Sequence, residues 1–124
     1  SLKRLPCKEP TFEAGRKAFS QFMQQPDSTS VIAYNDLQAM GFIAAAQQQQ
    51  IDVPQRFSII GIDDIADCTL LSPTLSSIRI DRRRESKAAV AMLFDNDNAD
   101  AHTSLKVPTQ FIERNSVSIP GSDH

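Results

Sequence analysis

The sequence contains no apolar run long enough to cross a lipid bilayer and no segment with the pattern of a signal peptide. Its formal net charge of -2 lacks the basic excess with which domains bind nucleic acid. Cys7 and Cys68 lie far apart, without a CxxC pair or a neighbouring histidine. We therefore expect free thiols, no metal site, no membrane contact and a cytoplasmic location.

Motifs of the common nucleotide-binding and hydrolytic enzymes are absent as well. Neither G-x-G-x-x-G nor G-x-x-x-x-G-K-[ST] occurs, so dinucleotide and P-loop sites have no support. No G-x-S-x-G elbow is present, and His102 and His124 lie in a polar loop and at the chain end. A Ser/His/Asp triad is therefore not expected. We predict no catalytic residues, no cofactor and no enzymatic activity.

What the sequence does contain is an alternation of short apolar runs with segments of helical periodicity. Its 124 residues are enough for one domain with a real core. Helices are predicted after Thr11 as N-cap, at 37–49 and at 83–94. Strands are predicted at 2–7 (weak), 31–34, 57–62, 75–80 and 105–114. Pro108 places the last strand at an edge. This order predicts an α/β fold whose open, mostly parallel sheet is flanked by helices on both faces.

Two of the predicted helices carry features that indicate close packing. Gly15 lies on the apolar stripe of the first helix, which indicates close approach to a neighbouring element. The helix at 37–49 is apolar nearly all round, so it is expected to be buried on more than one side. One side can face the sheet and the other a second copy of the protein. Asp36 is the predicted N-cap of this helix.

Polar residues follow two of the predicted strands where each strand ends. VIAYND ends at Asn35 and Asp36, and SIIGIDD ends at Asp63 and Asp64. In an open α/β sheet, ligands bind beyond the carboxyl ends of the parallel strands. A carboxylate at Asp63 suits ligand hydroxyls, and Asn35 offers both a donor and an acceptor. Tyr34 either stacks on a ligand or belongs to the core, and the alternative for Asp63 and Asp64 is that both cap a turn.

Two other interpretations concern charged residues. Asp63 and Asp64 together would suit Mg²⁺ beside a phosphate, as in receiver-type signalling domains. That arrangement also requires a lysine at a late strand end, where Lys106 does not fit. The basic run 82–84 with Lys87 fits a solvated crossover better than an anion contact, and it is too short to predict nucleic-acid binding.

Four segments, in order and at the usual spacing, carry a family resemblance. VIAYNDLQAMGFIAAA, IDVPQRFSIIGIDD, SPTLSSIRID and VPTQFIERNS together resemble the sugar-responsive transcriptional repressors of the LacI/GalR family. The match covers about residues 15–116 and looks like the second half of their effector-binding core, a type I periplasmic-binding-protein-like subdomain. The resemblance implies effector contacts at Asn35 and Asp63. It also implies a homodimer interface that includes Met40, Ala44, Leu70 and Leu71.

The resemblance also implies how the chain is divided. Residues 1–80 and 105–116 would form the C-terminal subdomain, 81–96 the crossover and a helix, and 117–124 a tail. That helix would pack on an N-terminal subdomain absent from this sequence, so here we predict it to be loose, repacked or in an intermolecular contact. The start at Ser1 rather than Met is expected of a fragment or a processed product. Mild departures from the family pattern occur at Ser76, Ser77 and Ser86.

The implied function is that of the effector-binding and dimerisation portion of a bacterial transcriptional repressor. Its effector would be a small sugar or sugar phosphate. It would reach DNA only through a missing N-terminal helix-turn-helix. The alternative is the periplasmic sugar-binding component of a transport system. An upstream helix-turn-helix would favour the repressor, and a signal peptide would favour transport.

Overall fold

The computed structural model describes residues 2–94 and 106–120, and its elements follow the predicted order. They are α1 (Phe12–Met23), β1 (Ser30–Ile32), α2 (Asp36–Gln48), β2 (Ser58–Ile62), the short 3-10 helix η1 (Ala66–Thr69), β3 (Ser76–Ile80), α3 (Arg82–Phe94) and β4 (Thr109–Ile112). Residues 2–7 are predicted as a weak strand, but they have no regular secondary structure and lie outside the sheet. No helix in these ranges is both long and apolar enough to span a membrane.

The four strands form one open sheet in the order β1-β2-β3-β4. β1, β2 and β3 run parallel, and β4 pairs antiparallel with β3 at the edge. The predicted sheet type and the edge position of the last strand are therefore confirmed. Pro108 stands just before β4, where its missing N–H interrupts no ladder.

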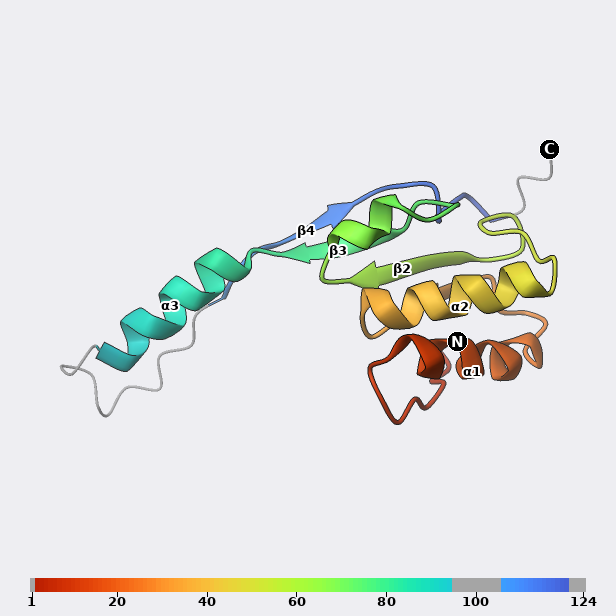
Figure 1. The fold of residues 1–124 in the computed structure, drawn as a ribbon, viewed down its shortest axis with the longest axis horizontal. Coiled ribbons are helices and arrows are strands. Elements are labelled where there is room, and N and C mark those ends of the chain that lie inside the picture. Colours follow the sequence, from red (N-terminus) through yellow and green to blue (C-terminus); the bar gives the residue numbers. More distant parts are fainter. Residues whose placement is uncertain (1, 95–105, 121–124) are drawn as a thin grey trace.

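The two helices that precede β2 pack as successive layers. α2 lies against β2, and α1 lies against α2 (Figure 1). α1 begins at the predicted N-cap Thr11, whose Oγ1 accepts a hydrogen bond from the Ala14 N–H at 3.2 Å. α1 therefore covers one of the sides of α2 that a second copy of the protein could have covered. The sheet and α1 together account for the all-round apolar character of α2.

Glycines allow the backbones of α1 and α2 to come into contact. A Cβ on Gly15 would overlap the carbonyl of Gln38, and a Cβ on Gly41 would overlap the carbonyl of Phe12. The close approach predicted from Gly15 is confirmed. Any larger residue at either position would force the two helices apart.

An aromatic cluster forms the centre of the core between the two helices and the start of β2. Its ring centroids lie 5.0–6.2 Å apart, mostly in edge-to-face arrangements. Each such pair stabilises the fold by about 0.5–1.5 kcal/mol beyond the contribution from burying the rings. The members are Phe19, Phe22, Phe42 and Phe57.

The helix α3 differs from the rest of the fold because it projects away from the body (Figure 1). None of its residues is buried, and Val90, Met92, Leu93 and Phe94 are exposed. The predicted helix is present. Repacking onto this chain, one of the three outcomes expected for it, is not seen among the described residues.

Candidate functional site

The polar residues predicted as a site follow the carboxyl ends of two neighbouring strands, at one end of the sheet. β1 and β2 are parallel neighbours, so the segments that follow their carboxyl ends meet there. A direct contact joins them, because the N–H of Ile65 donates to Asp36 Oδ2 at 2.9 Å. The start of α2 is therefore fastened to the turn that carries Asp63 and Asp64.

Asn35, and not Asp36, is the N-cap of α2. Its Oδ1 accepts a hydrogen bond from the Gln38 N–H at 2.9 Å, and its Nδ2 donates to the Pro10 carbonyl at 3.0 Å. The prediction of Asp36 as the cap is wrong because Asn35 has the extended backbone that an N-cap requires, whereas Asp36 is already helical. A ligand contact by Asn35 stays a prediction. Both polar atoms of its side-chain amide already form hydrogen bonds within the fold, so a ligand would bind to atoms that keep these partners.

Asp36 instead occupies a buried hydrogen-bond network. It is 1% exposed, and its Oδ1 accepts from the hydroxyl of Ser77 at 2.6 Å. The Ser77 hydroxyl oxygen in turn accepts from the Asp64 N–H at 3.0 Å. One carboxylate thus orients two backbone amides of the turn, directly at Ile65 and through Ser77 at Asp64. A Cβ on Gly61 would overlap this carboxylate, which explains the glycine before the turn.

The turn has an unusual backbone at both aspartates. Asp63 has φ 111 and Asp64 has φ 52, a region that L residues seldom adopt, although aspartate tolerates it better than most. Residues held in such conformations cost about 1–3 kcal/mol each, and they persist where the surroundings fix them. Here the Asp63 N–H donates to the Ile78 carbonyl at 2.9 Å, the Asp64 N–H donates to Ser77, and the Ile65 N–H donates to Asp36.

Asp64 is held by two arginines. Its Oδ1 accepts from Arg114 Nη2 at 2.7 Å, and its Oδ2 accepts from Arg79 Nε at 2.7 Å. The carboxylate is only 4% exposed, and burial by itself raises its pKa. The hydrogen bonds and charges of Arg114 and Arg79 outweigh that effect, so the pKa of Asp64 lies below its ordinary value. Asp64 is therefore a structural ion-pair residue rather than a ligand contact.

Asp63 is more accessible and has a different partner. Its Oδ1 accepts from Arg82 Nη2 at 2.6 Å, and the two side chains are 27% and 66% exposed. Because the carboxylates of Asp63 and Asp64 are bound to different arginines, they do not converge as a Mg²⁺ site would require. Within the described ranges, no group of three or more His, Cys, Asp or Glu residues could hold a metal ion.

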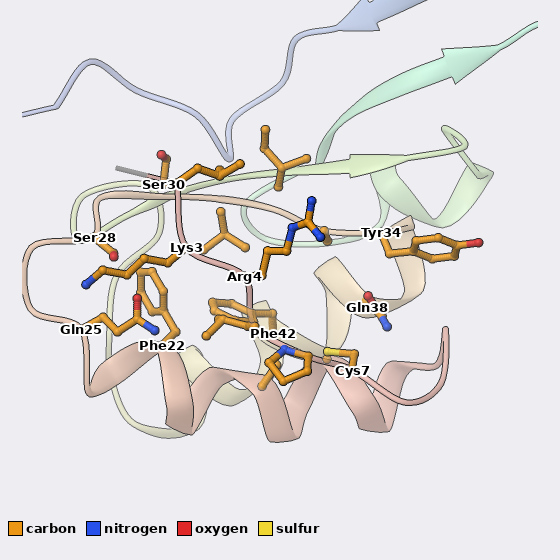
Figure 2. A pocket seen from close by; sticks show the side chains of 18 of the residues that line it. Lys3, Arg4, Cys7, Phe22, Gln25, Ser28, Ser30, Tyr34, Gln38 and Phe42 are labelled. Atoms are coloured by element: carbon orange, nitrogen blue, oxygen red, sulfur yellow. The ribbon is translucent and has the colours of Figure 1, made fainter.

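Tyr34 is 74% exposed, which excludes the interpretation that it belongs to the core. It lines a hollow of about 1120 Å³ between residues 2–8 and the surfaces of β1 and α1 (Figure 2). In Figure 2 its ring lies at the rim and points outward. Neither Asn35 nor Asp63 lines this hollow.

The residues implied in a dimer interface differ in their exposure. Leu70 is 80% exposed, and Leu71 is half-buried against the core. Ala44 is partly exposed, but Met40 is 6% exposed and packs inside this chain. Met40 could therefore add little area to an interface. The interface itself stays a prediction.

The two cysteines are both free, Cys7 exposed and Cys68 buried. Burial and, next, the nearby Asp36 carboxylate raise the pKa of the Cys68 thiol to about 12. Cys68 is therefore a protonated core residue at neutral pH.

Comparison with known proteins now identifies the family. A model of the periplasmic binding protein-like domain matches residues 3–117. The chain belongs to this family, in the form found in regulators of the LacI family. It is 38% identical over 109 residues to the HTH-type transcriptional repressor PurR of Photorhabdus laumondii, a match that covers 85% of the chain and 32% of the repressor. The chain thus spans about a third of the length of the curated relatives it matches.

Solved structures agree with this assignment. A LacI family transcriptional regulator from Arthrobacter sp. FB24, in complex with lactose, is 30% identical with a TM-score of 0.71 over 89% of this chain and 43% of that one. A sugar-binding LacI family regulator from Escherichia coli, complexed with phosphate, is 26% identical with a TM-score of 0.75 over 89% and 40%. These relatives are regulators, which agrees with the expectation that this chain is not an enzyme.

Proposed function

We propose that this chain is the effector-binding and dimerisation portion of a transcriptional repressor that responds to a small sugar or sugar phosphate. The main support is Asp63, an accessible carboxylate beyond the carboxyl end of a central parallel strand. Its N–H donates to the Ile78 carbonyl, and the Asp36 network holds the turn that follows it, so its geometry is set before a ligand arrives. Lactose in one relative and phosphate in another support a ligand of this chemistry.

The proposed mechanism rests on the exposure of Asp63 and of α3. Asp63 lies at the carboxyl-terminal end of the parallel strands. The helix α3 leaves the body directly after β3, and its apolar residues are exposed. A second subdomain that covers α3 would also close over Asp63. A ligand held between the two subdomains would favour the closed arrangement, and this population shift would reposition DNA-reading heads joined through a homodimer. Contact with DNA would come only through a helix-turn-helix outside this chain. The protein would act in the cytoplasm.

The experiment uses the longer protein that contains this chain, with calorimetric titration of ribose, glucose, lactose and sugar monophosphates. Asp63→Asn is expected to weaken binding of the responsive sugar by about tenfold or more, because a charge-assisted hydrogen bond is lost. Asp67→Asn, an exposed change in the nearby η1, is the matched control and should bind as the unaltered protein does. Equal binding by the Asp63→Asn and unaltered proteins would contradict the proposal.

A signal peptide upstream of this chain would favour the alternative, a periplasmic sugar-binding component of a transport system. The relatives described above favour the repressor, because they are transcriptional regulators. An operator-binding assay on the longer protein distinguishes the two functions. Release or capture of operator DNA on addition of the sugar is expected of the repressor and not of the transport component.

A further inference from the structure

The partner of Asp63 gives the candidate site a second charge. Arg82 is the first residue of α3 and follows β3, the strand beside β2. Its Nη2 donates to Asp63 Oδ1 at 2.6 Å, although the two residues are 19 positions apart. A carboxylate and a guanidinium thus stand together beyond the ends of two neighbouring parallel strands.

Each member of this pair keeps unused hydrogen-bonding capacity. A guanidinium carries about five N–H donors in a planar fork. The described residues supply an acceptor to one nitrogen of Arg82, and that acceptor is Asp63 Oδ1. The second oxygen of Asp63 accepts no hydrogen bond from them. Arg82 is 66% exposed, so a ligand can reach its remaining donors.

Neighbouring charges do not supply Arg82 with another partner. Asp64 is occupied by Arg79 and Arg114, and Asp36 is buried and turned toward Ser77 and Ile65. Asp81 directs its Oδ1 to the N–H of Arg84 at the start of α3. Asp63 is therefore the one carboxylate that pairs with Arg82 in the described part of the chain. None of the other three aspartates would therefore compete with a ligand anion for the free donors of Arg82.

We propose that the effector is a hydroxyl-rich molecule with an anionic group, a phosphate or a carboxylate, which Arg82 binds while Asp63 accepts hydrogen bonds from its hydroxyls. This inference rests on the proposed function of the same site. The fork of Arg82 matches the oxygens of a phosphate or carboxylate, and such charge-assisted pairs are stronger than neutral hydrogen bonds. A neutral sugar gains the Asp63 contact but carries no charged oxygens for the fork of Arg82. Arg82 is thus a specificity-determining residue.

The test compares neutral sugars with their anionic derivatives on the longer protein. Ribose and glucose are titrated against their terminal monophosphates and their aldonic acids, by calorimetry at fixed salt. The unaltered protein is expected to bind an anionic derivative at least about tenfold more tightly than its neutral parent. Arg82→Gln should remove this preference by weakening binding of the anionic derivative, while affinity for the neutral parent stays unchanged.

Two further variants sharpen the test. Arg83→Gln removes an adjacent exposed guanidinium and should leave the preference intact. Arg82→Lys keeps the charge but loses the planar fork, so it should retain only part of the preference. The aldonic acids and the monophosphates identify which anion the site takes. Thermal unfolding of each variant checks that the protein remains folded.

The outcomes separate this inference from the proposed function. Equal affinity for neutral and anionic sugars, with binding that still depends on Asp63, overturns the anion preference and leaves the proposed function intact. An unchanged preference in Arg82→Gln also overturns it. If Arg82→Gln only tightens binding of neutral sugars, Arg82 is a latch on Asp63 and not an anion site. Failure of every sugar and derivative to bind the unaltered protein overturns both proposals.

Discussion

Two helices of this chain, α2 and α3, are both 13 residues long but have opposite environments. Most residues of α2 are buried, whereas none of α3 is. The difference is one of partners, because α2 lies between α1 and β2 while α3 projects from the body (Figure 1). α3 still carries exposed Val90, Met92, Leu93 and Phe94. An apolar surface of this kind is typical of an interaction site, so we expect α3 to pack against a partner outside the described residues.

The largest contrast is expected between two phenylalanines, one on each helix. Phe42 of α2 is 3% exposed in the aromatic cluster, and Phe94 of α3 is 78% exposed. Phe42→Ala should lower the free energy of unfolding by about 3–5 kcal/mol, because it leaves a cavity among packed rings. Phe94→Ala in the same 124-residue chain should change it by less than about 0.5 kcal/mol.

Urea denaturation of the two variants measures both values. A large loss from Phe94→Ala in this chain would mean that α3 packs in solution, and the contrast between the helices would fail. In the longer protein, the same change should become destabilising if a second subdomain covers α3.

A smaller contrast is expected between the aspartates at the starts of the two helices. Asp36→Ala should cost about 3 kcal/mol, because the Ser77 hydroxyl and the Ile65 N–H lose a buried acceptor. Asp81→Ala should cost about 1 kcal/mol, since Asp81 is exposed and its Oδ1 accepts from the Arg84 N–H at the start of α3. Chemical denaturation of the two variants tests this order. Equal losses would show that the Asp36 network does not hold the turn.

The smallest effect concerns pH and the buried Asp64. Its pKa is lower in the folded state than the ordinary value of 3.8, because Arg114 and Arg79 outweigh the effect of burial. A carboxylate with a lowered folded-state pKa stabilises the fold fully above the ordinary value. This contribution is lost as the pH falls from about 4 through the folded-state pKa. We expect the free energy of unfolding to decrease over that range.

Denaturation curves collected between about pH 6 and about pH 3 measure this dependence. In Asp64→Asn the part of the slope due to Asp64 should vanish, whereas the exposed Asp67→Asn should keep it. An unchanged slope in Asp64→Asn would show that the arginine pairs do not hold this carboxylate in its charged form.

Much of the local structure could be predicted because it depends on neighbours in sequence. Thr11 caps α1 as expected, and Pro108 marks the edge strand. The exchange of roles between Asn35 and Asp36 was missed. Both residues suit an N-cap, and the choice depends on where the preceding strand ends, which an apolar pattern leaves open by a residue or two. The pairing of Asp63 with Arg82 was missed too, since the run 82–84 was interpreted as a solvated crossover.

The sequence by itself determined the order of helices and strands, the mostly parallel sheet and the family. These properties are carried by periodicity and by short motifs that each segment holds alone. Only the tertiary structure decided which charges meet. Asp64 reaches Arg114 across 50 positions, Asp36 reaches Ser77 across 41, and Asp63 reaches Arg82 across 19. Any of several arginines could have served each carboxylate. The choice follows from strand register and from the turn that Asp36 holds, which exist only once the chain is folded.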